Sequence, residues 1–172
     1  MSQQPTTTYD QNELVITRKL NAPRSLVFQV WSEESHLRNW WGPAGLEWVE
    51  SKLDFRPGGI FHYCMRTPEG DVMWGKFVFH EIEAPERIVF VNSFSDPEGN
   101  TVRAPFSPVF PIEVRNELLF TEEDGQTLIT LRGRPINATQ EELDFFNQMK
   151  DSMNQGFNGT FTQLETYLAS LQ

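Results

Sequence analysis

The chain has 172 residues and a formal net charge of −10, from 24 acidic and 14 basic side chains. This charge repels phosphate backbones and anionic lipid surfaces, so neither nucleic-acid binding nor peripheral membrane binding is expected. The single cysteine, Cys64, excludes an internal disulfide and a multi-thiolate metal site, and no apolar run is long enough for membrane insertion.

The composition favours a folded protein that is rich in aromatic residues. Hydrophobic residues make up 38% of the chain, with 14 Phe, 5 Trp and 3 Tyr, the side chains that fill large cores and line apolar pockets. The opening residues, MSQQPTTTYDQNE, lack the basic and apolar regions of a secretory signal. We therefore predict a disordered tail at residues 1–12, one domain over residues 13–172, and a cytoplasmic location.

The first elements are a strand and two short helices. Residues 13–20 alternate like a strand. Residues 21–31 carry Pro23 at a first helical position, followed by an apolar stripe at helical spacing. Ser32 is expected to cap a second short helix, and a Gly-Pro pair follows the two tryptophans at its end.

Six further segments read as strands, separated by turns rich in Gly, Pro, Asp and Glu. They cover residues 46–55, 60–66, 72–82, 87–94, 112–122 and 126–134. The proline-spaced segment 103–111 is interpreted as a stiff ordered loop in preference to a polyproline recognition ligand.

The C-terminus changes to helical spacing. From Leu143 the apolar positions recur in steps of three and four, and Thr139 with Glu142 forms a capping box. The pattern predicts one helix of about thirty-three residues and roughly 50 Å. Gly156 and Gly159 inside it indicate close backbone packing or a bend.

This order of elements predicts an α+β fold. A strongly curved antiparallel sheet of six or seven strands wraps around the long C-terminal helix, and the two short helices follow the first strand. Because a curved sheet does not close fully against a helix, we expect a cavity between them. The expected lining residues are Trp41, Phe61, Tyr63, Met65, Met73, Gly75, Phe77, Asn116, Leu118, Met149, Met153 and Phe157.

Strand alternation places most of these side chains on the inner face. Asn116 is the polar exception, and it needs a partner, which is either neighbouring backbone or a ligand that it orients. Met149 and Met153 suit either a packed core or an adaptable pocket. A bulge would shift these faces by one residue, and Gly75 is the expected place for one.

No catalytic motif or metal site emerges from residue spacing. His36, His62 and His80 do not share a helical face at ligand spacing, and His62 and His80 are expected to point outward. Cys64 alternates away from the cavity, with no base beside it. No nucleophile elbow or phosphate loop is present in the sequence, so no cofactor is expected.

Several long segments resemble a known family. They are APRSLVFQVWSEESHLRNWWGP, LDFRPGGIFHYCMRTPEG, WGKFVFHEIEAPERIVFVNSFSD and DSMNQGFNGTFTQLETYL. These are similar to bacterial homologues of the heat-shock protein 90 ATPase activator C-terminal domain, within the START-like helix-grip (SRPBCC) superfamily. The resemblance covers roughly residues 13–171, and Phe157 departs from it, since relatives carry Trp there.

The resemblance implies a helix-grip fold and leaves three functions open. The first is binding of a small hydrophobic molecule (a lipid, polyketide or aromatic compound) without catalysis. The second is stimulation of a heat-shock protein ATPase, with a chaperone as partner. The third is cyclase-like or hydrolase-like chemistry in the same cavity, for which the inner face offers only Asn116, Tyr63 and Asn92. Either a monomer or a homodimer fits these expectations.

Overall fold

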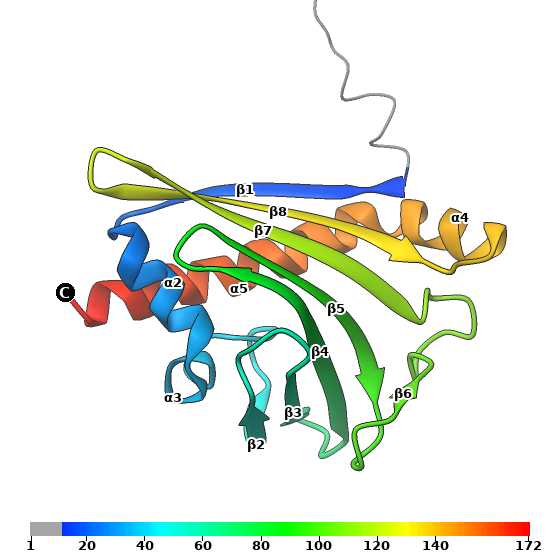
Figure 1. Cartoon of the computed structure of the whole chain (residues 1–172). Helices are drawn as coiled ribbons and strands as arrows, with labels where there is room; N and C mark the ends of the chain where they lie inside the picture. The colour runs from blue at the N-terminus through cyan, green and yellow to red at the C-terminus, as the bar shows by residue number, and fades with distance from the viewer. Residues whose placement is uncertain (1–11) are drawn as a thin grey trace, which may run out of the picture.

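The structure, a computed structural model, describes residues 12–172 (Figure 1). In chain order its elements are β1 (Leu14–Leu20), α2 (Arg24–Ser32), α3 (Glu34–Leu37), β2 (Glu47–Leu53), β3 (Ile60–Arg66), β4 (Val72–Glu83), β5 (Arg87–Ser95), β6 (Thr101–Val102), β7 (Glu113–Glu123), β8 (Gln126–Ile136), α4 (Gln140–Gln148) and α5 (Lys150–Ser170). The tail predicted at residues 1–12 lies outside the described residues except for Asn12, whose side-chain oxygen accepts a hydrogen bond from Asn147 at 3.1 Å.

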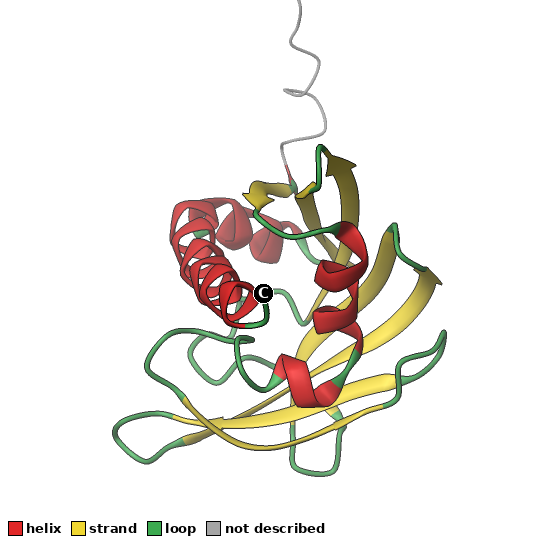
Figure 2. Ribbon diagram, turned by 90° about the vertical axis from the view of Figure 1, so that its left-hand side faces the viewer, coloured by secondary structure: helices red, strands yellow, loops and turns green. Residues whose placement is uncertain are grey.

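All strands belong to one antiparallel sheet. Its order is β1-β8-β7-β5-β4-β3-β2, and β6 pairs with β5. The count is eight instead of six or seven because the two residues of β6 pair with the end of β5. The sheet curves around α5, which lies along its concave side (Figures 1 and 2). The predicted α+β fold is confirmed.

Helix α2 begins at Arg24. Pro23 is its N-cap residue, with φ −68° and an extended ψ of 152°, so it lies one position before the first helical position at which it was predicted. Ser32 was predicted to cap the next helix, but Glu33 is the N-cap residue there. Ser32 is the last residue of α2, and its hydroxyl donates to the Gln29 carbonyl at 2.9 Å. Helix α3 starts after Glu33 and covers only four residues, so the second short helix is shorter than its sequence pattern predicts.

The long C-terminal helix is interrupted. Its capping box is present as predicted: the Glu142 N–H donates to Thr139 Oγ1 at 3.1 Å, and the Thr139 N–H donates to Glu142 Oε1 at 2.9 Å. The prediction of one continuous helix is wrong, because Met149 leaves helical geometry with φ −91° and ψ 2°. Its N–H is shared between the carbonyls of Phe145 and Phe146, which tightens the last turn of α4.

The two helical glycines do not mark a close contact. A Cβ built on Gly156 or Gly159 meets no atom within 4 Å beyond the helix's own backbone. The interpretation of close backbone packing is therefore wrong at both positions.

The bulge expected at Gly75 lies elsewhere. Gly75 pairs in regular register with Tyr63 on β3 and Phe94 on β5. In β4 the register shifts farther along, between Phe79 and Glu81, where the strand pairs with β5. The inner face predicted for residues 73–79 is therefore unaffected by the shift.

The core lies between the concave face of the sheet, α2 and the C-terminal half of α5. Its largest fully buried side chains are Trp40, Phe61, Phe146, Phe161, Leu20, Leu37, Ile88, Leu118, Ile129, Leu164, Leu168 and Val27. Burial of each apolar side chain of this size contributes about 1.5–3 kcal/mol. Of the helices within residues 12–172, none has the length and apolar character needed to cross a membrane.

Candidate binding site

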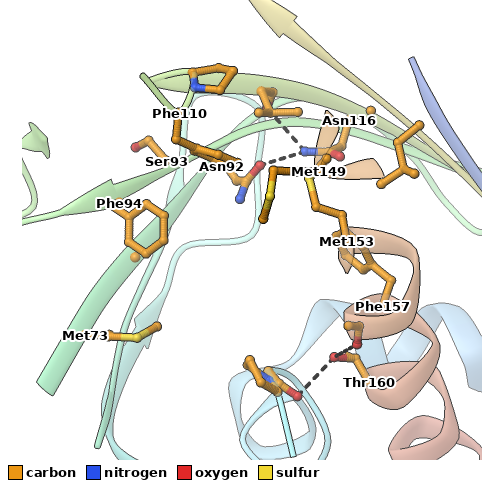
Figure 3. Close-up of a pocket in the computed structure, with 18 of the residues that line it drawn as sticks. Met73, Asn92, Ser93, Phe94, Phe110, Asn116, Met149, Met153, Phe157 and Thr160 are labelled. Carbon is orange, nitrogen blue, oxygen red and sulfur yellow. Dashed lines mark hydrogen bonds between the residues drawn. The ribbon is translucent and has the colours of Figure 1, made fainter. Parts of the chain in front are cut away.

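A cavity of about 330 Å³ lies between the concave face of the sheet and the first half of α5 (Figure 3). Strands β3, β4, β5 and β7, the end of α4, the segment after α3, and the segment between β6 and β7 form most of the rest of its wall, with single residues from β1 and β8. Nine of the predicted residues line it: Trp41, Tyr63, Met65, Met73, Gly75, Asn116, Met149, Met153 and Phe157.

The other three predicted residues lie in the packed core. Phe61 and Leu118 are fully buried, and Phe77 stacks on Phe90 with ring centroids 4.1 Å apart. Each points to the concave face as predicted, but each meets other core side chains instead of the cavity. Alternation identifies the face of a strand, whereas position along the groove decides between core and cavity.

Tyr63 lies over Gly75, its partner across β3 and β4. A Cβ on Gly75 would lie 2.6 Å from the Tyr63 hydroxyl oxygen and 2.7 Å from Cζ, so the phenol occupies the space that a side chain would need. Burial raises the pKa of Tyr63 to about 12, and the nearby Trp41 indole offsets part of this rise. The phenol is therefore a neutral hydrogen-bond donor at physiological pH.

The Trp41 indole lies on the same side of the cavity, but its N–H does not form a hydrogen bond with the Tyr63 hydroxyl. Its N–H is buried and has no partner within hydrogen-bond geometry among residues 12–172. The indole ring packs edge-on against Phe77 at 5.0 Å and near Tyr63 at 6.3 Å. Trp41 therefore acts mainly as an apolar part of the wall.

Asn116 lies over Gly133, its partner on β8, in a similar arrangement. Its side-chain oxygen would be 2.7 Å from a Cβ on Gly133. Its Nδ2 donates to the Val114 carbonyl at 3.2 Å and to Asn92 Oδ1 at 2.9 Å. The hydrogen bond to neighbouring backbone, one of the two alternatives that the sequence left open for Asn116, is present, and a second amide, Asn92, stands beside it in the wall.

The segment after α3 is held against α5. The Gly42 carbonyl accepts hydrogen bonds from Thr160 Oγ1 at 3.1 Å and Gln163 Nε2 at 2.8 Å. Gly42 has φ +103°, and a Cβ there would lie 2.6 Å from Met65 Sδ. This segment requires glycine both for its backbone conformation and for its contact with the cavity wall.

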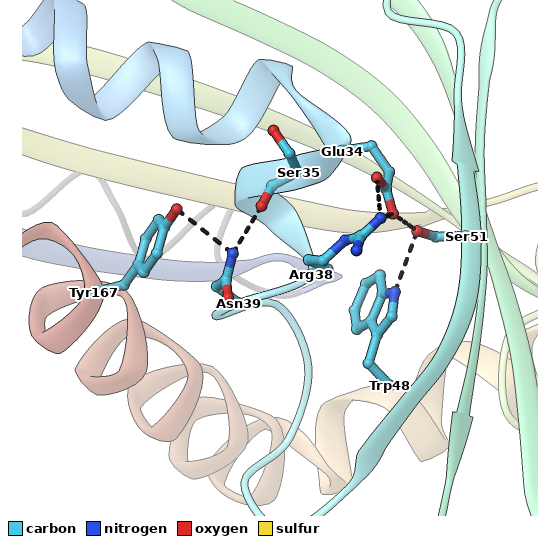
Figure 4. Close-up of polar contacts among 7 residues, drawn as sticks. All are labelled: Glu34, Ser35, Arg38, Asn39, Trp48, Ser51 and Tyr167. Carbon is cyan, nitrogen blue, oxygen red and sulfur yellow. Dashed lines mark hydrogen bonds and ion pairs between the residues drawn. The ribbon is translucent and has the colours of Figure 1, made fainter. Parts of the chain in front are cut away.

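Polar contacts fix α3 in place beside that segment (Figure 4). Arg38 Nη2 pairs with Glu34 Oε1 at 2.7 Å, and the hydroxyl of Ser51 on β2 donates to Glu34. These contacts hold the pKa of the Glu34 carboxyl below its usual value, with the Arg38 hydrogen bond as the largest cause. Asn39 Nδ2 donates to the Ser35 carbonyl at 2.7 Å and reaches the Tyr167 hydroxyl of α5 at 3.5 Å.

The segment between β6 and β7 forms one rim of the cavity. Phe106 and Phe110 both line it, and the Phe106 side chain is 60% exposed. Arg103 ties the segment to α4, since its Nη1 contacts Glu142 Oε2 at 2.8 Å and the Phe110 carbonyl at 3.3 Å. This is the ordered loop predicted from its proline spacing.

Sequence reasoning missed several lining residues. Asn92 and Phe94, which lie on the same face of β5, line the cavity but are absent from the predicted wall. The period of two along β5 was sufficient to find both. Phe146 lies on the same apolar helical stripe as Met149 and Met153, so helical spacing was sufficient to find it. Phe106 and Phe110 carried no such signal, because the path of a loop is not encoded in local periodicity.

The remaining candidate chemical groups lie away from the cavity. His62 stacks on Trp74 at 4.8 Å and contacts Ser95 Oγ at 3.1 Å, while His80 is exposed. Cys64 is buried, and burial is the main cause that raises the pKa of its thiol. Within residues 12–172 no group of three or more His, Cys, Asp or Glu side chains is arranged to hold a metal ion.

Solved structures with the same fold come from several bacteria. Protein Ms6760 from Mycobacterium smegmatis is 26% identical with a TM-score of 0.75, covering 92% of this chain and 91% of that one. Protein NE0264 from Nitrosomonas europaea is 22% identical with a TM-score of 0.74, covering 93% and 96%. The AHSA1 protein from Silicibacter pomeroyi is 18% identical with a TM-score of 0.69, covering 93% and 99%. No curated protein gave a significant match.

The family itself is shown by the sequence match. The model of the family described as "Activator of Hsp90 ATPase homolog 1-like protein" matches residues 21–169, which is most of the chain. The match includes the segment after α3, the Tyr63–Gly75 pair and all of α5 but its last residue, which together form much of the cavity wall. This protein therefore belongs to the family of activator of Hsp90 ATPase homolog 1-like proteins.

Proposed function

We propose that this protein binds a small, uncharged hydrophobic molecule in the cavity beneath α5. The observation that carries the proposal is the cavity itself, about 330 Å³ in volume and walled by aromatic, methionine and glycine residues. Small-molecule pockets in proteins span roughly 300–1,000 Å³ and combine apolar walls with a few polar groups. The volume of this cavity suits a ligand of two or three fused or linked rings.

The lining residues support an uncharged ligand. Among the described residues, the cavity wall contains no Asp, Glu, Lys, Arg or His. The polar side chains that it does contain are neutral, namely Tyr63, Asn92, Asn116 and Thr160, with Ser93 contributing from β5. Because burial of an unpaired ion carries a large desolvation cost, a charged ligand would bind poorly in this wall.

A matched pair of fluorescent probes tests the proposal. Phenylnaphthylamine is neutral, and anilinonaphthalene sulfonate is nearly the same molecule with a sulfonate added. We expect saturable binding of the neutral probe, with an affinity at least about tenfold higher than that of the sulfonate. Equal or stronger binding of the sulfonate would contradict the proposal.

Filling the cavity provides the structural control. Met153 lines the cavity from α5, whereas Gln155 on the same helix is exposed. Met153→Trp should remove uptake of phenylnaphthylamine while the protein stays folded by circular dichroism. Gln155→Trp adds the same side chain outside the cavity and should leave uptake unchanged. Unaltered uptake in Met153→Trp would place the probe elsewhere on the protein.

The family supports a ligand-binding or co-chaperone-like domain, so a second candidate function deserves a direct test. The family description names activation of the Hsp90 ATPase, and by that relationship this protein would stimulate a bacterial chaperone of that type. Steady-state ATP hydrolysis by the chaperone, with and without the protein, measures the effect. Stimulation that persists in Met153→Trp would make the co-chaperone role independent of the cavity.

A further inference from the structure

The two amides in the cavity wall have a fixed orientation. Asn116 Nδ2 contacts two oxygens at once, the Val114 carbonyl at 3.2 Å and Asn92 Oδ1 at 2.9 Å. A backbone carbonyl only accepts hydrogen bonds, so the Asn116 group facing it is the NH₂. The Asn92 group facing Asn116 must then be its oxygen.

This orientation leaves the Asn92 NH₂ without a partner among the residues that the structure describes. The group donates no hydrogen bond to any of residues 12–172, and it is not enclosed by protein atoms, since Asn92 is only partly buried and lines the cavity. Figure 3 shows its nitrogen directed away from Asn116, into the space bordered by Phe94, Phe110 and Met149. The cavity therefore contains a polar donor that faces apolar side chains.

The pair directs the NH₂ of Asn92 into the cavity and the side-chain oxygen of Asn116 toward β8. The Asn116 oxygen lies against Gly133 on β8, where a Cβ would be 2.7 Å away. The Thr160 hydroxyl is not a competing donor, because its single proton is already shared between the backbone carbonyls of Gly42 and Gly156. The strand register holds Asn92 at this place, because it pairs with residues on both neighbouring strands, β4 and β7.

We propose that the ligand carries an uncharged carbonyl oxygen, as in a ketone, ester or amide, and that the Asn92 NH₂ donates a hydrogen bond to it. This inference rests on the proposed function. A carboxylate would also accept the bond, but no cation in the wall balances its charge. A plain hydrocarbon would fit the apolar surfaces but leave the NH₂ unpaired when it displaces water. Asn92 thus contributes to ligand specificity within this cavity.

Two naphthalene compounds of matched shape test the role of the oxygen. Acetylnaphthalene carries a carbonyl, and isopropenylnaphthalene has a CH₂ group in place of the oxygen. Their affinities are measured by displacement of phenylnaphthylamine, which has no carbonyl. The ratio of the two affinities should fall about five- to tenfold in Asn92→Leu relative to the wild-type protein, the effect of losing one hydrogen bond.

A control on the opposite face separates this effect from a general disturbance of the sheet. Arg115 lies next to Asn116 on β7, outside the cavity wall. Arg115→Gln should leave the ratio unchanged. A ratio that stays constant in a folded Asn92→Leu protein would overturn the inference.

Vibrational spectroscopy adds a test whose wild-type measurement does not depend on the variant folding. The carbonyl stretch of isotope-labelled acetylnaphthalene should move to lower frequency on binding to the wild-type protein, as for a hydrogen-bonded ketone, and should return to its value in apolar solvent in Asn92→Leu. An unshifted stretch in the wild-type complex overturns the inference while the proposed function stands. If neither naphthalene compound nor phenylnaphthylamine binds, the proposed function itself fails, and this inference with it.

Discussion

The two ends of α5 face the same sheet, yet one end is packed and the other is hollow. Near the C-terminus, Phe161, Leu164 and Leu168 are fully buried. Near the N-terminus, Met153 and Phe157 are half-buried and border the cavity. The residues are apolar at both ends, so polarity does not explain the difference.

The difference comes from α2 and α3. These helices close one end of the groove, where Trp31 contacts Trp40 with ring centroids 4.6 Å apart and Phe28 contacts Phe120 at 5.2 Å. The other end is bordered by the segment between β6 and β7, by Phe146 of α4, and by residues that leave room, such as Gly75 and the methionines. In this protein the cavity thus lies where neither α2 nor α3 is inserted between the sheet and α5.

The largest expected effect is a difference in the free energy of unfolding that is lost when one apolar side chain is truncated at each end of α5. Phe161→Ala in the packed end should lower the free energy of unfolding by about 3–5 kcal/mol, because it creates a new void in a close-packed core. Met153→Ala should cost only about 1 kcal/mol, because that side chain already borders empty space. Urea unfolding at neutral pH measures both. Equal costs would mean that the hollow end is packed in solution.

The next effect is a pH dependence from the hollow end. Tyr63 has an ordinary pKa of 10.0, which burial raises to about 12 in the folded protein. The unfolded chain therefore releases this proton first as the pH rises. The contribution of Tyr63 to the free energy of unfolding is fully present below pH 10 and falls by about 2–3 kcal/mol as the pH rises toward 12. The difference between the wild-type protein and Tyr63→Phe in urea unfolding isolates this contribution, and identical pH profiles would contradict it.

A smaller effect tests the contact between Tyr63 and Gly75. Gly75→Ala places a Cβ against the phenol and should destabilise the protein by about 1–3 kcal/mol. Combined with Tyr63→Leu, which removes that ring, the cost should be clearly less than the sum of the two single changes. Thermal or urea unfolding of the four proteins completes the cycle. Strict additivity would show that the two residues do not touch.

The smallest expected effect is a gain in stability on the open side of α5. Gly156→Ala should stabilise the protein by about 0.5–1 kcal/mol, since the new methyl group meets no atom within 4 Å and alanine favours the helix. Gly42→Ala is the matched contrast: its backbone has φ +103° and its Cβ would meet Met65, so it should destabilise. Loss of stability in Gly156→Ala would reveal a close contact at that helix face.

Local patterns in the sequence determined the elements and their faces. Alternation along the strands placed Tyr63, Gly75 and Asn116 on the concave side, and the capping box of Thr139 and Glu142 placed the start of α4. These features follow from the chain itself, because periods of two and 3.6 and the bonds of a helix cap involve neighbours in sequence.

Only the tertiary structure decided which inner side chains border empty space. Phe61, Phe77 and Leu118 share the face of the cavity residues but lie in the core, because the side chains around them come from other elements of the chain. The break at Met149 likewise had no local signal, since neither proline nor glycine lies beside it. The orientation of the Asn92 NH₂ depends on the Val114 carbonyl of β7. This carbonyl fixes the Asn116 amide, which in turn contacts the Asn92 oxygen. Such features depend on contacts between segments far apart in sequence, and local periodicity carries no information about them.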